Sequence, residues 1–114
     1  MLSQAQTLAD YGRETEAAAE FVRAAVCEEQ AACLLNAQGE EFDAAVHRVS
    51  AASCQERLGE YARAVTLLRA ALASSFPDDY RAEVQQLFNR CRALAHKDLR
   101  RLFRRGLRRS PAIS

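Results

Sequence analysis

Apolar side chains recur along the chain at the three- and four-residue intervals of an α-helix. On a helix that turns by about 100° per residue, such positions form one stripe that can pack on a neighbour. Small side chains beside the stripe let the second helix come close. In residues 60–75 the stripe consists of Tyr61, Val65, Leu68 and Leu72. The pattern predicts a protein built only of α-helices.

Glycines and prolines divide the sequence into five helical stretches. The chain has only four glycines and two prolines, and the segments between them are rich in residues with high helix propensity. Turns of a few residues place consecutive helices antiparallel. Asp78 or Asp79 can cap the last helix, and Gly106 is expected to end it. The predicted helices span 2–11, 14–36, 41–57, 60–75 and 79–105.

Four small or apolar positions recur after an interval of 47 residues. They are Gly12, Ala17, Phe21 and Ala24, which reappear as Gly59, Ala64, Leu68 and Ala71. Two stacked helical hairpins would produce this repeat, because one hairpin cannot bury its apolar face alone. Chance recurrence in alanine-rich helices would also produce it. We expect one antiparallel helical-hairpin bundle over residues 1–105, with a hairpin in 1–40, a three-helix unit in 41–105, and a flexible basic tail over 106–114.

The two ends of the chain differ in charge, although the net charge is only +1. Residues 1–96 carry 9 basic and 14 acidic side chains, whereas residues 97–114 carry 7 basic and 1 acidic. An arginine-rich helix end attracts phosphates, anionic lipid or acidic protein, or it is a solvated end that balances an acidic body. The candidate residues for contact with a membrane or another anion are Arg100, Arg101, Arg104, Arg105, Arg108 and Arg109.

The cysteines form no C-x-x-C pair and have no histidine at metal-ligand spacing. They are Cys27, Cys33, Cys54 and Cys91. We expect no zinc site and no other cofactor, and we interpret the cysteines as buried, reduced thiols of a reducing compartment. The first residues lack the basic and apolar regions of a secretory signal, and no apolar run approaches the roughly 18 residues of a membrane span. The sequence thus predicts a cytoplasmic location.

Motifs for catalysis are missing from the sequence. It contains no glycine-rich phosphate loop and no nucleophile elbow. His47 and His96 lie on different predicted helices, and adjacent acidic pairs point away from one another on a helix, so neither set makes an acid–base dyad. We expect a protein without enzymatic activity. The basic end has no recognised fold for reading bases, so a nucleic acid partner is not expected.

A second apolar line runs along the last predicted helix, offset from its core stripe. It consists of Phe88, Ala95, Leu99 and Phe103. An apolar line beyond the core contact is a candidate binding face, or it packs on an N-terminal helix. Leu67 also lies well away from the stripe of its own helix, so it either packs on a second neighbour or is exposed for a partner.

Two helical families share features with this sequence. The spacing G-x(4)-A-x(3)-[FL]-x(2)-A resembles the second helix of a tetratricopeptide repeat. Residues 43–105 are more similar to a microtubule-interacting-and-trafficking (MIT) domain, a three-helix bundle. The stretch ERLGEYARAV resembles the turn between the first two helices of that family, and AEVQQLFNRCRALAHKDL resembles its third helix. The matching positions of the third helix are Arg90, Ala93 and Leu94.

The MIT resemblance implies a non-catalytic adaptor in endosomal trafficking or autophagy. Such a module would receive an amphipathic C-terminal helix of an ESCRT-III-type protein in a groove between its second and third helices, in the cytoplasm or at an endosomal membrane. The alternatives are a tetratricopeptide-like adaptor, a subunit that completes a partner's fold, and a protein that binds an anionic membrane through its basic end. The partner-binding residues that the resemblance implies are Leu67, Leu68, Ala70, Ala71, Glu83, Val84, Leu87, Phe88, Arg90 and Cys91, with Glu83 and Arg90 on the rim.

Overall fold

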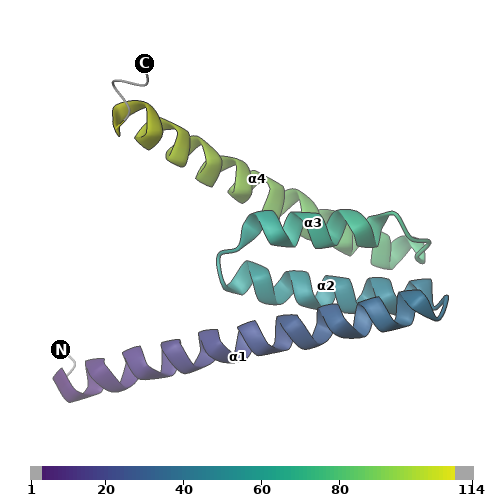
Figure 1. Ribbon diagram of the computed structural model, residues 1–114, viewed down its shortest axis with the longest axis horizontal. Coiled ribbons are helices and arrows are strands. Elements are labelled where there is room, and N and C mark those ends of the chain that lie inside the picture. The colour runs from purple at the N-terminus through teal and green to yellow at the C-terminus, as the bar shows by residue number, and fades with distance from the viewer. Residues whose placement is uncertain (1–3, 110–114) are drawn as a thin grey trace.

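Four α-helices make up residues 4–109, which are the residues that the computed structural model describes (Figure 1). The helices are α1 (Gln4–Ala37), α2 (Glu41–Arg57), α3 (Tyr61–Leu72) and α4 (Asp78–Arg109). Side-chain burial and contacts are described for residues 11–106. No strand occurs in the described part of the chain, so the all-α prediction is confirmed. The prediction of five helices is wrong, because the residues expected to form an N-terminal hairpin form the single helix α1.

Gly12 lies inside α1 and does not interrupt it. One glycine costs a helix about 1 kcal/mol relative to alanine, and the good helix formers on both sides offset that cost. Residues 4–37 therefore contain no turn, and the predicted hairpin in residues 1–40 is corrected to one helix. The predicted 47-residue repeat paired Gly12 with Gly59, and the structure shows that only the second of these glycines lies in a turn.

Two turns with the same geometry set the length of α2. Gly39 and Gly59 both adopt a left-handed backbone, with φ angles of 78° and 76°. In each turn the glycine N–H donates to the carbonyl three residues back, and the next N–H donates to the carbonyl five residues back. These N···O distances are 3.1 and 2.9 Å in the first turn and 3.0 and 2.8 Å in the second. The chain thus repeats one helix-ending motif after 20 residues.

The turn from α3 to α4 is longer than the other two, and it shortens α3 relative to the sequence prediction. α3 ends at Leu72 and α4 begins at Asp78. Arg81 fastens this turn, because its guanidinium donates to the carbonyl of Leu72 at 3.0 Å and also to the carbonyl of Ser74. The carbonyl of Pro77 accepts the backbone N–H of Arg81 at 2.9 Å, which places Pro77 at the N-cap position directly before α4.

Gly106 does not end the last helix, contrary to the prediction, because α4 continues to Arg109. A glycine permits a helix end but requires one only where the backbone turns left-handed, and the glycines that do so in the described residues are those of the two shorter turns. The predicted flexible tail is therefore helical over residues 106–109. Its residues 110–114 lie outside the described part of the chain.

Alanine lines most helix contacts, while larger apolar side chains gather where α2, α3 and α4 meet. In the described part of α1 the buried side chains are Ala25 and Ala32. Consecutive helices pack on each other, α1 on α2, α2 on α3 and α3 on α4. The core cluster of α2, α3 and α4 consists of Ala52, Ala64, Val65, Leu68, Val84, Phe88 and Cys91. We call residues 41–109 the α2–α4 unit.

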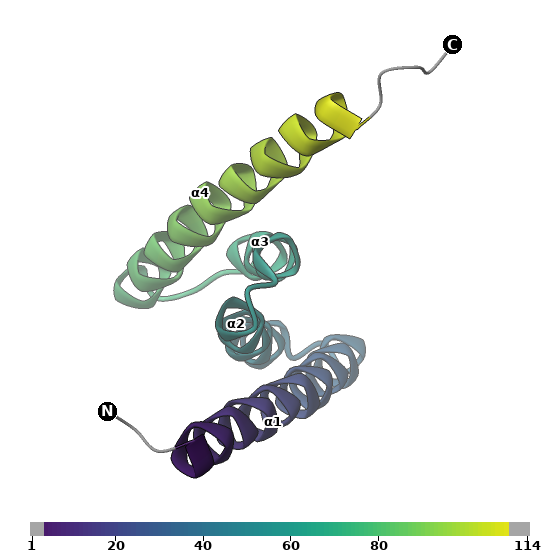
Figure 2. The same cartoon turned by 90° about the vertical axis from the view of Figure 1, so that its left-hand side faces the viewer.

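α1 and α4 each extend beyond the helix on which they pack. Figure 1 shows the start of α1 and the end of α4 projecting from the same side of the molecule, and Figure 2 shows α2 and α3 between them. All side chains from Arg13 to Glu20 and from Leu99 to Gly106 are exposed. We call residues 4–20 the α1 arm and residues 99–109 the α4 arm. With these arms the radius of gyration is 18.1 Å, against roughly 13 Å for a compact domain of similar length.

Substituting a glycine by alanine should lower the free energy of unfolding in the turns and raise it inside α1. Gly39→Ala and Gly59→Ala are expected to lower it by about 1–2 kcal/mol each, because an alanine side chain strains a left-handed backbone. Gly12→Ala should raise it by up to about 1 kcal/mol, because the position is helical and open around a Cβ atom. Urea unfolding followed by circular dichroism measures both effects. A stabilising Gly59→Ala would contradict the turn geometry.

Candidate functional site

Half of the predicted partner-binding residues belong to the protein's own core. Leu68, Ala71, Val84, Phe88 and Cys91 are buried, with exposed fractions between 0% and 8%. Leu67 and Leu87 are partly buried against the same cluster. The middle of α3 packs directly on the first half of α4, so the space between them is filled by the chain itself. At these positions the structure leaves no open groove for a partner helix.

The remaining predicted residues are exposed, and one of them contacts another helix of the chain. Ala70 and Glu83 lie on the surface. Arg90 of α4 donates from Nε and Nη2 to the two carboxylate oxygens of Glu56 in α2, at 2.6 and 2.9 Å. Two parallel hydrogen bonds of this kind fix both side chains in one plane. Arg90 therefore ties α4 to α2, and its guanidinium is engaged within the chain.

The contact between Glu56 and Arg90 changes the acidity of its members. The hydrogen bond from Arg90 holds the pKa of Glu56 below its ordinary value, and the same bond raises the pKa of Arg90. Burial raises the pKa of Cys91 to about 11, helped by the negative charge of Glu56, and the Cys91 Sγ lies 3.8 Å from a carboxylate oxygen of that residue. Cys91 is thus a neutral thiol at physiological pH, and it fills space in the core.

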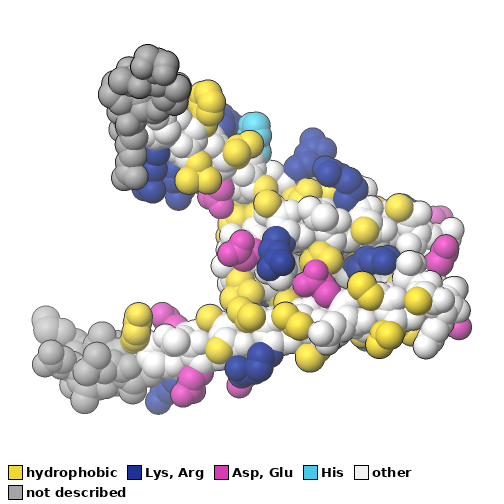
Figure 3. Space-filling view, viewed as in Figure 1, with side chains coloured by type: hydrophobic (Ala, Val, Ile, Leu, Met, Phe, Trp, Pro, Cys, Tyr) yellow, Lys and Arg dark blue, Asp and Glu magenta, His cyan; other side chains and the backbone are white. Residues whose placement is uncertain are grey.

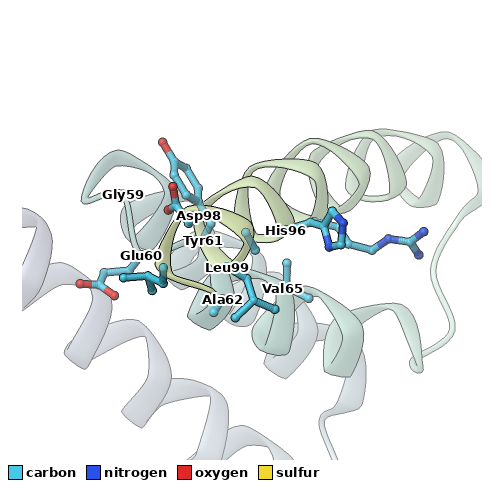
Figure 4. Close-up of a pocket in the computed structure, with 11 residues that line it drawn as sticks. Gly59, Glu60, Tyr61, Ala62, Val65, His96, Asp98 and Leu99 are labelled. Carbon is cyan, nitrogen blue, oxygen red and sulfur yellow. The ribbon is translucent and has the colours of Figure 1, made fainter. Parts of the chain in front are cut away.

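An open groove lies instead between the start of α3 and the second half of α4. Its volume is about 480 Å³, and Figure 4 shows side chains of both helices around the same hollow. The groove exists because α3 begins at Tyr61 while α4 runs on past that point. We call it the α3/α4 groove. It is lined by Gly59, Glu60, Tyr61, Ala62 and Val65 at the α3 end, and by Arg92, Ala95, His96, Asp98, Leu99 and Leu102 of α4.

The α4 arm continues this apolar lining and surrounds it with arginines. Leu99, Leu102 and Phe103 are exposed to 64%, 63% and 67%, which is unusual for three large apolar side chains within five residues. A shallower hollow of about 350 Å³ lies beside Leu99 and Phe103. Figure 3 shows hydrophobic and Lys or Arg side chains next to one another on this part of α4. The exposed arginines are Arg100, Arg101, Arg104 and Arg105, and the side chains of Arg108 and Arg109 lie outside the described part.

The opposite end of the α2–α4 unit is closed by aromatic side chains. Phe42, Phe76 and Tyr80 pack edge to face, with ring centroids 5.1 to 6.3 Å apart. Desolvation in this cluster raises the pKa of Tyr80. Farther along α4, Phe88 is covered by Arg69 and Arg92, whose guanidinium carbons lie 5.7 and 6.0 Å from its ring centre. Among the described side chains, this apolar face of α4 is therefore open at its α3/α4 groove end.

The two histidines lie on different helices. His47 Nδ1 is 2.5 Å from a carboxylate oxygen of Glu28 and joins α2 to α1, whereas His96 lies at the edge of the α3/α4 groove. The prediction of buried thiols is correct for Cys91 alone, because Cys54 is half-buried and the other two, Cys27 and Cys33, are exposed. No three His, Cys, Asp or Glu side chains among the described residues could hold a metal ion together. No described helix is long and apolar enough to span a membrane.

Sequence reasoning found part of the α3/α4 groove. It identified Leu99 and Phe103 as a second apolar line, and the structure exposes both. It named Leu102 only as an apolar residue of the basic C-terminal segment, and it missed the start of α3, because a helical stripe shows which residues are apolar and does not show where the neighbouring helix begins. The signal in the sequence was that the helical stretch after Gly59 is shorter than the helical stretch after Pro77, which indicates that the second helix extends beyond the first.

No protein-family model, no curated protein and no solved structure matches this chain. The functional inference therefore depends on the α3/α4 groove, the α4 arm and the charges around them.

Glu56→Gln should make the protein less sensitive to acid. Arg90 lowers the folded-state pKa of Glu56, so the ionised carboxylate stabilises the fold above the unfolded-state pKa, and this stability is lost as the pH falls through the folded-state value. Between neutral pH and about pH 3, the free energy of unfolding should fall less for Glu56→Gln than for the unmodified protein. Glu20→Gln, at an exposed position of the α1 arm, is the matched control. Equal acid losses in all three proteins would contradict the role of the pair.

Proposed function

We propose that this protein is a non-catalytic interaction module that docks an amphipathic helical segment of a partner protein in the α3/α4 groove. One observation carries the proposal. The apolar face of α4 that packs on α3 continues past the start of α3, where Leu99 and Leu102 remain more than 60% exposed. An incoming helix would cover these leucines as α3 covers Val84 and Cys91 farther back, with apolar anchors at intervals of three and four residues.

The charge around the groove selects an acidic partner. Arg92 lines the groove, and the four exposed arginines of the α4 arm follow directly after it. Glu60 and Asp98 are its two acidic lining residues. The excess of positive charge would attract a helix that carries leucines on one face and glutamates or aspartates on its flanks, and would repel a basic one.

The resemblance to MIT domains supports the same mode of binding. In that family the ligand groove lies between the second and third helices, which correspond to α3 and α4 of the α2–α4 unit. The proposed groove lies nearer the start of α3 than the resemblance implied, because the middle of the interface is closed. A C-terminal helix of the ESCRT-III type remains a candidate ligand, and an endosomal or autophagic adaptor remains the corresponding cellular role.

A synthetic amphipathic helix of leucine and glutamate should bind the protein, and its leucine and lysine counterpart should not. Leu102→Asp should weaken binding of the acidic peptide about tenfold or more, because a buried leucine contributes about 1.5–3 kcal/mol and the new carboxylate repels the peptide. Fluorescence anisotropy of labelled peptides gives the affinities. Higher salt should weaken the binding as well.

Leu34→Asp is the matched control for this measurement. Leu34 is 65% exposed on α1, far from the groove in sequence and on a helix that does not line it. It should bind the acidic peptide as the unmodified protein does. Equal binding of both peptides, or equal losses in both variants, would overturn the proposed site.

A second candidate function is attachment to an anionic membrane surface through the α4 arm. The observation that favours it is Phe103, which is 67% exposed between Arg100 and Arg104 beside a shallow apolar hollow. Interfacial helices combine an apolar face with flanking basic residues in this way. Membrane attachment does not require the α3/α4 groove, so an experiment can distinguish the two proposed functions.

Phe103→Asp should abolish binding to vesicles that contain phosphatidylserine if the α4 arm is a membrane anchor. The substitution removes the largest exposed apolar side chain of the arm and adds a charge that anionic lipid repels. Vesicle sedimentation measures the bound fraction, with Leu34→Asp again as the control. No binding by the unmodified protein, or equal binding to neutral vesicles, would eliminate this function.

A further inference from the structure

The α1 arm carries a seam of exposed side chains along one face. Its members are Tyr11, Thr15 and Ala18 of the arm and Val22 just beyond it, at intervals of four, three and four residues, which is the spacing of paired helices. Tyr11 is 70% exposed and Val22 50% exposed. The seam continues the face of α1 on which Ala25 and Ala32 are buried against α2, and it is exposed because α1 runs on past the end of α2. The hydroxyl of Thr15 donates to the Tyr11 carbonyl at 3.1 Å, so it needs no further partner.

The two arms carry opposite charge. Between residues 11 and 20 the α1 arm has three exposed glutamates, Glu14, Glu16 and Glu20, and one arginine. Between residues 99 and 106 the α4 arm has four exposed arginines and no acidic residue. The arms therefore carry opposite net charge, which attracts the α1 arm of one copy to the α4 arm of another.

The arms of one molecule are kept apart by its own fold. They leave the same side of the molecule, and α2 and α3 lie between α1 and α4 (Figures 1 and 2). At 1.5 Å per residue, the 17 residues of the α1 arm and the 11 residues of the α4 arm are roughly 25 and 16 Å long. Two copies that face each other about a two-fold axis can bring each α1 arm against the α4 arm of the other copy. One such arrangement makes two identical contacts.

We infer that a second copy of this chain docks on the α4 arm through its α1 arm, in a two-fold dimer with two α1–α4 contacts. The inference rests on the proposed function, because it treats the second copy's acidic α1 arm as one more ligand of the basic apolar surface. It also adds regulation to that function. Leu99 and Leu102 belong to both the α4 arm and the α3/α4 groove, so an external acidic helix and the second copy compete for them.

Charge decides between this pairing and the other two that a two-fold axis allows. Pairing of two α1 arms would bring two acidic helices together, and pairing of two α4 arms would bring two basic helices together. Like charges side by side destabilise helix pairs, whereas opposite charges stabilise them. Only the mixed pairing covers both exposed apolar seams and brings unlike charges together.

Two charge-reversal variants test the inference. In the first, Glu14, Glu16 and Glu20 are changed to arginine, and in the second, Arg100, Arg104 and Arg105 are changed to glutamate. All six positions are exposed, so the fold should persist, which circular dichroism checks. The unmodified protein should approach twice its monomer mass in sedimentation as its concentration rises, and higher salt should shift it back. Each variant alone should associate at least tenfold more weakly, and an equimolar mixture should recover the dimer, because every contact then joins opposite charges.

Other outcomes overturn the inference in identifiable ways. A monomer at every concentration up to the millimolar range rejects the dimer. If the arginine-to-glutamate variant dimerises alone as the unmodified protein does, the α1 arms pair with each other; if the glutamate-to-arginine variant does so, the α4 arms pair. A mixture that gains nothing over its components also rejects the proposal. A monomer that still binds the acidic peptide through Leu102 leaves the docking function intact, and a charge-dependent dimer that binds no peptide leaves only the self-association.

Discussion

Contact between alanine-lined helix faces determines how the four helices lie. A methyl side chain lets two helices come close but contributes little apolar area, so such a contact positions a helix more than it stabilises one. α1 is held in this way, by Ala25 and Ala32 and by the contact between Glu28 and His47. The larger buried side chains Leu68 and Phe88 lie in the α2–α4 unit, which is therefore the better-anchored part of the molecule.

Local sequence patterns determine the elements here more fully than they determine the contacts between them. Both ends of the span 41–57 were predicted correctly. A glycine with a left-handed backbone lies in the turn before this helix, and another lies in the turn after it. Gly12 and Gly106 are also glycines, but they do not adopt the left-handed φ angle. Whether a glycine adopts it depends on the hydrogen bonds that the neighbouring residues make. Half of the predicted partner-binding residues are buried for a related reason. Leu68, Phe88 and Leu99 are equally apolar in the sequence, and only the starting point of α3 decides which of them are covered.

The difference in length between α3 and α4 produces both the groove and the arm. α3 has 12 residues and α4 has 32, so α3 is less than half as long as α4, and the apolar face of α4 beyond it meets water. Such a surface carries a risk of aggregation, and the arginines around Leu102 and Phe103 keep it hydrated. The proposed docking surface and the risk of aggregation thus have the same origin.

Each helix packs on the next one in the sequence, and this arrangement affects how the fold opens. The first helix rests mainly on the second, whereas the second, third and fourth share one cluster and the tie between Glu56 and Arg90. Detaching α1 breaks a single alanine-rich interface and leaves that cluster whole. Amide protons of the first helix should therefore exchange with solvent through local opening, while those in the middle of α3 exchange only when the whole unit melts.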